Sequence, residues 1–237
     1  ITFDTKDDQI PLTIYKTTTD GTTTTWKENL LKGLVLQLHI SDGYIYIPRL
    51  GDKIYSVTRI PLANPAADEE IFASLKNGAA AIAEKDGYMY VADYFAQEVV
   101  KINKLTGDTT IILNSADGIP EEGALGLSFD TSGNLLISTY SKKSILKYNG
   151  TDLITLTSNL PANVLSLKVD KQNDIYVTLE GMGLRRYKPD FSTYELVSAY
   201  EDDEVWGIDI TKSGAVLYSN MSNIIYKLNP SVTIQGT

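Results

Sequence analysis

The chain contains no cysteine, which excludes disulfide bonds, thiolate catalysis and cysteine-based zinc sites. It has a single histidine, His39, which lies in an apolar run. A Ser-His-Asp triad would have to use this residue, and no GxSxG motif accompanies it, so we expect a structural role for His39. No apolar run approaches the roughly 18 residues of a membrane-spanning helix.

Positive charge is also scarce, since 21 Lys and Arg residues face 30 Asp and Glu residues, for a net charge of −9. Binding to a phosphate backbone needs clustered Lys and Arg, so a nucleic acid is not an expected partner. Apolar residues make up 43% of the chain, as is usual for a folded protein. The start at Ile1 instead of Met suggests a processed chain, and we predict a secreted, periplasmic or cell-surface location.

A repeated pattern of short strands and tight turns is the main feature that is present. In the stretch 125–148, the strand pattern of Leu125, Leu127 and Phe129 leads to the turn at Gly133. Two further strands and a fourth at 153–157 follow within about 40 residues, which is the length of one propeller blade. The sequence therefore predicts an all-β fold, a β-propeller of four-stranded antiparallel blades.

Equivalent turns recur along the chain at Gly43, Gly87, Gly133, Asn173 and Gly214, which are 44, 46, 40 and 41 residues apart. This even spacing predicts one propeller domain over residues 1–237, most simply with six blades. The first blade is incomplete at the N-terminus, with ITFDT (1–5) as its second strand and a Thr-rich hairpin turning at Asp20-Gly21. The predicted blades are 1–33, 34–78, 79–123, 124–163, 164–204 and 205–237. The segment 232–235 is either the outer strand of the last blade or the strand that closes the ring.

Two stretches, GLSFDTSGNLLIS (126–138) and DGYMYVADYFAQEVVKIN (86–103), resemble the blade signature of the NHL-repeat and gluconolactonase/strictosidine-synthase-like group of six-bladed propellers. Enzymes of this group hold calcium or a similar ion in the central channel, with Glu, Asn and Asp ligands at the starts of inner strands. The resemblance implies Asn163, Asp203 and Glu204 as the metal ligands here. Other inner strands open with Ala or Leu, so no cofactor is predicted for the chain, and calcium belongs to the alternative hypothesis.

The loops between the second and third strands of each blade open on the same face as the connections between blades, and we call this the loop face. Exposed aromatic and charged side chains on such a face can bind sugars or peptides. The residues predicted to bind a ligand there are Arg49, Tyr94, Phe95, Tyr140, Glu180 and Trp206. The competing interpretation is that the aromatic residues pack between blades while the charges are solvated.

These observations favour a non-enzymatic binding scaffold that holds a protein or carbohydrate ligand on the loop face and at the channel mouth, because no catalytic constellation is recognisable. The first alternative is a divalent-metal-dependent hydrolase of the lactonase or esterase kind. The second is a structural subunit that assembles by strand addition. The chain is therefore expected to be either a monomer or part of an assembly formed by pairing of edge strands.

Overall fold

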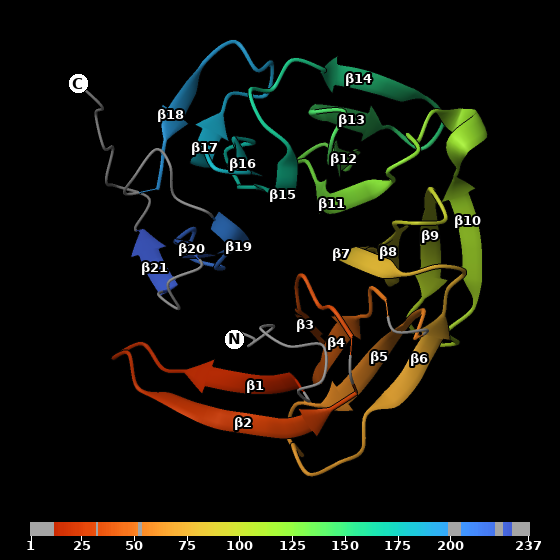
Figure 1. Cartoon of the computed structure of the whole chain (residues 1–237), viewed down its shortest axis with the longest axis vertical. Coiled ribbons are helices and arrows are strands. Elements are labelled where there is room, and N and C mark those ends of the chain that lie inside the picture. The colour runs from red at the N-terminus through yellow and green to blue at the C-terminus, as the bar shows by residue number, and fades with distance from the viewer. Residues whose placement is uncertain (1–11, 32, 52–53, 199–204, 221–224, 229–237) are drawn as a thin grey trace.

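The computed structural model describes residues 12–31, 33–51, 54–198, 205–220 and 225–228. Figure 1 shows antiparallel sheets arranged around a common centre, with the first strand of each blade innermost. Among the described residues the single helical element is a short 3-10 turn, η1 (Ser115–Asp117). No helix of this part of the chain is long and apolar enough to cross a membrane.

Four blades have four strands each, and they follow one another along the chain. The first contains β3 (His39–Ser41), β4 (Tyr44–Pro48), β5 (Ser56–Pro61) and β6 (Glu70–Ser74). The second contains β7 (Ala79–Lys85), β8 (Tyr88–Asp93), β9 (Glu98–Asn103) and β10 (Thr109–Leu113). The third contains β11 (Ala124–Phe129), β12 (Leu135–Thr139), β13 (Ser144–Tyr148) and β14 (Leu153–Thr157). The fourth contains β15 (Val164–Val169), β16 (Ile175–Leu179), β17 (Gly183–Tyr187) and β18 (Tyr194–Leu196).

The fifth blade has three strands among the described residues. They are β19 (Val205–Ile210), β20 (Val216–Asn220) and β21 (Ile225–Leu228). The five equivalent turn residues all adopt positive φ, between 68° and 87°, as the repeat predicted. The turn chemistry read from the sequence is therefore confirmed.

The prediction of six blades is wrong for the described part of the chain, which forms five blades and a separate hairpin. The hairpin consists of β1 (Leu12–Thr17) and β2 (Thr23–Leu30), which turn at Gly21 and form a sheet of their own. Its buried residues Leu12, Ile14 and Leu30 pack against the first blade instead of facing a further pair of strands. The strands predicted at 1–5 and 232–235 lie outside the described residues.

The inner strands of the second to fifth blades each begin with a β-bulge at the same position. In β7, Ala79 pairs with Asp93 and Ala81 with Ala92, so that Ala80 is an extra residue in the ladder. The same shift of register occurs in β11, β15 and β19. A bulge re-aims one side chain, and here it does so at the same end of these four inner strands, which face the centre of the ring of blades (Figure 1).

Close packing of neighbouring inner strands follows the bulge. A Cβ on Gly126 would lie 2.7 Å from Ser138 Oγ and 3.0 Å from the backbone nitrogen of Leu167 in the next blade. The following residue, Leu127, is buried in the core shared by the second, third and fourth blades. The small residue after the bulge thus lets adjacent blades approach closely around the channel.

Candidate functional site at the channel mouth and loop face

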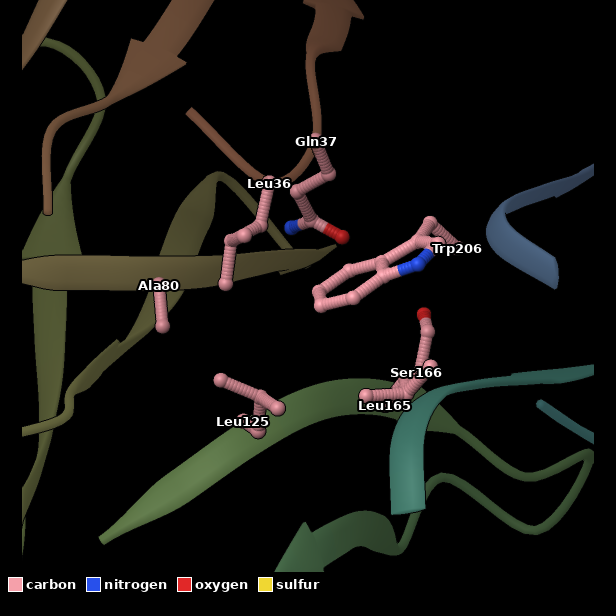
Figure 2. Close-up of a pocket in the computed structure, with 7 residues that line it drawn as sticks. All are labelled: Leu36, Gln37, Ala80, Leu125, Leu165, Ser166 and Trp206. Atoms are coloured by element: carbon pink, nitrogen blue, oxygen red, sulfur yellow. The ribbon is translucent and has the colours of Figure 1, made fainter. Parts of the chain in front are cut away.

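A pocket at the bulged ends of the inner strands, called the channel mouth below, includes the bulged residues Ala80, Leu125, Leu165 and Trp206. The lining side chains are Leu36, Gln37, Ala80, Leu125, Leu165, Ser166 and Trp206. Figure 2 shows the indole of Trp206 reaching across a pocket whose opposite wall is formed by Leu36, Ala80 and Leu125. The cavity between these side chains is small, about 10 Å³, which is close to the space that one water molecule needs.

Trp206 differs from the other bulged residues in its exposure. Ala80, Leu125 and Leu165 are 1%, 8% and 5% exposed, whereas Trp206 is 39% exposed. It is held in place by Val205, which is fully buried, and by Gly207, at which a Cβ would lie 2.6 Å from Ser219 Oγ. A large aromatic surface is therefore offered to solvent from a rigid strand.

The loop face carries a polar cluster next to this mouth, at the ends of second strands. Glu180 follows β16 and accepts hydrogen bonds from Tyr140 Oη at 2.9 Å and from Asn163 Nδ2 at 2.7 Å. Glu122 accepts a bond from the backbone of Ser141 at 3.1 Å. The structure thus brings together Tyr140, Glu180 and Asn163 from three different segments.

The tyrosines of the loop face remain protonated donors at neutral pH. The hydrogen bond to the Glu180 carboxylate raises the pKa of Tyr140 above its usual value, and burial adds to this. Burial also raises the pKa of Tyr94, as do the nearby Glu122 and Tyr140. The ring of Phe95 is 54% exposed and packs edge-on against Tyr94, with centroids 5.0 Å apart. Tyr94 and Phe95 therefore form an aromatic step on the loop face.

Arg49, predicted for the same face, is instead fully buried. Its guanidinium is paired with Glu69 and donates to the carbonyl oxygen of Leu31 at 2.7 Å. Glu69 also accepts a hydrogen bond from the backbone nitrogen of Leu31 at 3.0 Å. Arg49 thus joins the β1–β2 hairpin to the first blade and offers no surface to a ligand.

The residues predicted to bind a metal are only partly covered by the structure. Asp203 and Glu204 lie outside the described residues, and Asn163 uses its amide to contact Glu180. Within the described part, no group of three or more His, Asp and Glu side chains is close enough to hold a metal ion. Glu180 is the acidic neighbour of Asn163. The sequence analysis had predicted that Glu180 binds a ligand on the loop face and had not named it as a metal ligand.

Most residues of the pocket were missed by the sequence analysis, which named only Trp206. A signal was present: Val35-Leu36-Gln37-Leu38, Ala79-Ala80-Ala81-Ile82, Ala124-Leu125-Gly126-Leu127, Val164-Leu165-Ser166-Leu167 and Val205-Trp206-Gly207-Ile208 share one pattern. In each stretch Ala or Val comes first, the second position varies, and Leu or Ile comes fourth. In a regular strand the second residue would be paired with the neighbouring strand. Because it is instead the extra residue of a bulge, its side chain turns toward the channel mouth.

The opposite end of the inner strands carries a charged network around Glu84. Its carboxylate accepts hydrogen bonds from His39 Nε2 at 2.8 Å and from Lys104 Nζ at 2.5 Å, and Lys104 also contacts Asp42. Burial alone would raise the pKa of Glu84, but the bonds from Lys104 and His39 outweigh it and lower the pKa to about 2. His39 has the structural role that the sequence predicted.

Acid is expected to weaken the fold through Glu84. A carboxyl whose pKa is lowered from 4.5 to about 2 stabilises the fold above pH 4.5, and this contribution is lost as the pH falls toward 2. After allowance for partial solvent exposure, we expect Glu84→Gln to lower the free energy of unfolding by about 1–2 kcal/mol at pH 7. Urea titrations should show a smaller difference in the free energy of unfolding between wild type and variant at pH 3 than at pH 7. A difference that does not depend on pH would contradict this assignment.

The fold and the pocket together define a β-propeller with an apolar channel mouth, and the comparisons agree on the fold. No family model matches the chain, and no curated protein matches its sequence. A virginiamycin B lyase from Staphylococcus aureus has a similar structure, with a TM-score of 0.65 at 14% identity over 98% of this chain and 88% of the lyase. A gluconolactonase-like protein gives a TM-score of 0.66 at 13% identity, over 94% of this chain and 84% of its own.

An extracellular domain of a one-component system from Bacteroides thetaiotaomicron is also similar, with a TM-score of 0.63 at 12% identity. The match covers 98% of this chain but 34% of the sensor's. Likenesses at 12–14% identity show the fold alone, because one fold hosts unrelated activities. The fold-level resemblance to gluconolactonase-like propellers is confirmed, whereas a relationship to NHL-repeat proteins stays a prediction.

Proposed function

We propose that the chain is a non-enzymatic binding propeller that holds its ligand at the channel mouth, with the loop face as the surrounding contact surface. The observation that carries this proposal is the half-exposed Trp206 in a ring of apolar side chains, fixed by bulges at the starts of the inner strands. A large apolar surface left in contact with water on a rigid scaffold is typical of a binding site.

The loop face is proposed to contribute contacts around the pocket. Tyr94, Phe95, Tyr140 and Glu180 offer aromatic faces and hydrogen-bonding groups, which suit a protein or carbohydrate partner. We also propose a location outside the cytoplasm. It is supported by the similarity to extracellular domains of sensor proteins and by the cysteine-free composition.

A screen against glycan and peptide arrays tests the proposal. Binders should lose at least about ten-fold in affinity on Trp206→Ala, because a stacked aromatic side chain at a binding centre contributes about 2 kcal/mol or more. Trp26→Phe is the matched control, since Trp26 lies in β2 of the hairpin, and it should bind as the wild type does. Mass spectrometry should recover the bound ligand unchanged. A chemically altered ligand would contradict a purely binding role.

A metal-dependent hydrolase is the second candidate, favoured by the Asn163 amide and the Glu180 carboxylate, which meet on the loop face through a hydrogen bond from Asn163 Nδ2. Calcium needs about six to eight oxygen ligands, and the described residues supply too few for a complete site. Thermal unfolding of EDTA-treated protein separates the candidates. A calcium site should raise Tm by several degrees at about 100 times the dissociation constant, and a shift lost in Asn163→Ala would support the hydrolase.

A further inference from the structure

A line of aromatic and acidic side chains crosses the loop face from the second blade to the fourth. These three blades are neighbours in the ring (Figure 1). The side chains come from the ends of second strands and from the connection that leads into β11. We call this line the aromatic–acidic strip, and it consists of Tyr94, Phe95, Glu122, Tyr140 and Glu180.

Contacts between the loops hold the strip together. The backbone next to Glu122 approaches Tyr94 closely, since a Cβ on Gly123 would lie 2.0 Å from the carbonyl oxygen of Tyr94. The Glu122 carboxylate accepts a hydrogen bond at 3.1 Å from the backbone N–H of the residue after Tyr140. Tyr140 Oη in turn donates to Glu180 at 2.9 Å. The strip is therefore one connected surface.

Neither carboxylate of the strip forms an ion pair with a basic side chain in the described part of the chain. Glu180 accepts its hydrogen bonds from neutral groups, the hydroxyl of Tyr140 and the amide of Asn163. The ion pairs of the described basic residues involve other acids. Burial raises the pKa of Tyr94 and the charge of Glu122 raises it further, so this ring lies in the negative field of the strip.

Two lysines, Lys142 and Lys143, are the positive charges nearest to the strip in the sequence. Both are exposed in the loop between β12 and β13, and neither pairs with Glu122 or Glu180. Charges held in water are strongly screened, so these lysines reduce the negative field of the strip without neutralising it.

The aromatic members of the strip add an attraction for cations. Phe95 is 54% exposed and packs edge-on against Tyr94, with ring centroids 5.0 Å apart. The face of an aromatic ring attracts a cation, and arginine is the usual partner because its planar guanidinium can stack on the ring. The same guanidinium can donate two hydrogen bonds to one carboxylate.

The first blade holds an arginine of its own by this combination of ring and carboxylate. The guanidinium of Arg59 lies 4.5 Å from the ring centroid of Tyr44, and its Nε donates to Glu70 at 2.5 Å. The aromatic–acidic strip offers the same two kinds of group, but its carboxylates lack the arginine among the described residues. A partner can supply it.

Resting on the binding function proposed above, we infer that the partner on the loop face is an arginine-containing peptide segment. Its guanidinium groups lie on Phe95 and pair with Glu122 and Glu180. Because the strip crosses three blades, an extended segment can reach both carboxylates. The net charge of −9 adds a long-range attraction for a basic partner. A neutral glycan could stack on the ring but would gain nothing from the two carboxylates.

Three blocked pentapeptides test this inference. Each has glycine at the first, third and fifth positions, and the two residues between them are both Arg, both Lys or both Gln. They are titrated into ¹⁵N-labelled protein at about 50 mM salt while the backbone signals of Phe95 and Ser141 are followed. The arginine peptide should bind with a dissociation constant on the order of 0.1–1 mM. The lysine peptide should bind at least about threefold more weakly and the glutamine peptide at least about tenfold more weakly.

Charge variants separate the strip from the general charge of the protein. Glu122→Gln combined with Glu180→Gln should weaken the arginine peptide at least about tenfold. The matched control combines Asp86→Asn with Asp108→Asn, which changes the net charge equally in turns at the opposite ends of the strands, and it should change binding less than about twofold. Glu122→Gln alone, at an exposed position, should weaken binding about threefold and does not depend on the stability of the double variant.

Two single variants test the ring and the neighbouring lysine. Phe95→Leu keeps an apolar side chain but removes the aromatic face, and it should weaken the arginine peptide about two- to fivefold. Lys142→Gln should strengthen binding up to about twofold, because it removes a repulsive charge. Equal losses in the two double variants, or a glutamine peptide that binds as tightly as the arginine peptide, would overturn the inference.

The outcome is separable from that of the proposed function. Neutral array ligands that depend on Trp206 and ignore the Glu122 and Glu180 double variant, together with no response to the arginine peptide, would keep binding at the channel mouth and overturn the inference. Arginine-peptide binding as described, with array ligands that ignore Trp206→Ala, would support the inference and remove the channel mouth from the proposed function.

Discussion

Glu69→Ala is expected to lower the free energy of unfolding by about 3–5 kcal/mol, the usual cost of leaving one partner of a buried ion pair without the other. Arg49 is fully buried and the Glu69 side chain is 4% exposed, so the charge of Arg49 would have neither water nor a counter-ion. The hydrogen bond from the Leu31 backbone would also be lost. Urea unfolding followed by circular dichroism measures the change.

Glu70→Ala provides the matched control, because Glu70 is the next residue and also pairs with an arginine. The Arg59–Glu70 pair is exposed, with side chains 26% and 53% accessible, and its loss should cost no more than about 1 kcal/mol. Similar losses in the two variants would mean that Arg49 finds another partner or water. That result would contradict the role of Arg49 as the link between hairpin and blade.

Gly123→Ala should be the second large effect, with a loss of about 2–4 kcal/mol and a rearranged loop face. Gly123 has φ of +66°, and a Cβ there would lie 2.0 Å from the carbonyl oxygen of Tyr94. This contact is with backbone, so a rotamer change cannot relieve it, and the loop that carries Tyr94 and Phe95 must move. Thermal unfolding and ligand affinity should therefore fall together.

Gly181→Ala is the control that measures the cost of backbone strain without a steric clash. Gly181 has nearly the same φ, +64°, but a Cβ there meets no atom within 4 Å. Its substitution should cost only about 1 kcal/mol, the penalty of a left-handed conformation for alanine. If Gly123→Ala were no worse than Gly181→Ala, the close approach between Gly123 and Tyr94 would not exist in solution.

The blades could be predicted from the sequence because their signals are local. Turn residues such as Gly43 and Asn173 need positive φ whatever surrounds them, and strand alternation extends over only a few residues. The number of blades could not be read in this way. The β1–β2 hairpin has good strand and turn residues, and only its packing of Ile14 against the first blade shows that it is not a blade itself.

The site was less predictable because its features depend on contacts between distant segments. Arg49 follows a strand and precedes a loop, which suggests exposure, and its burial depends on Glu69 and Leu31. Tyr140 and Glu180 were predicted to lie on the same face, but the hydrogen bond between them forms only because neighbouring blades meet there. The channel mouth required knowledge of the bulge that turns Trp206 and its equivalents inward.

The most direct test of the central claim, binding at the channel mouth, uses the fluorescence of Trp206. The chain has two tryptophans, so Trp26→Phe leaves Trp206 as the single reporter. Titration with a ligand from the array screen should change its emission saturably, with the same dissociation constant that calorimetry gives. Calorimetric binding without any change in Trp206 emission would place the ligand elsewhere and contradict the account.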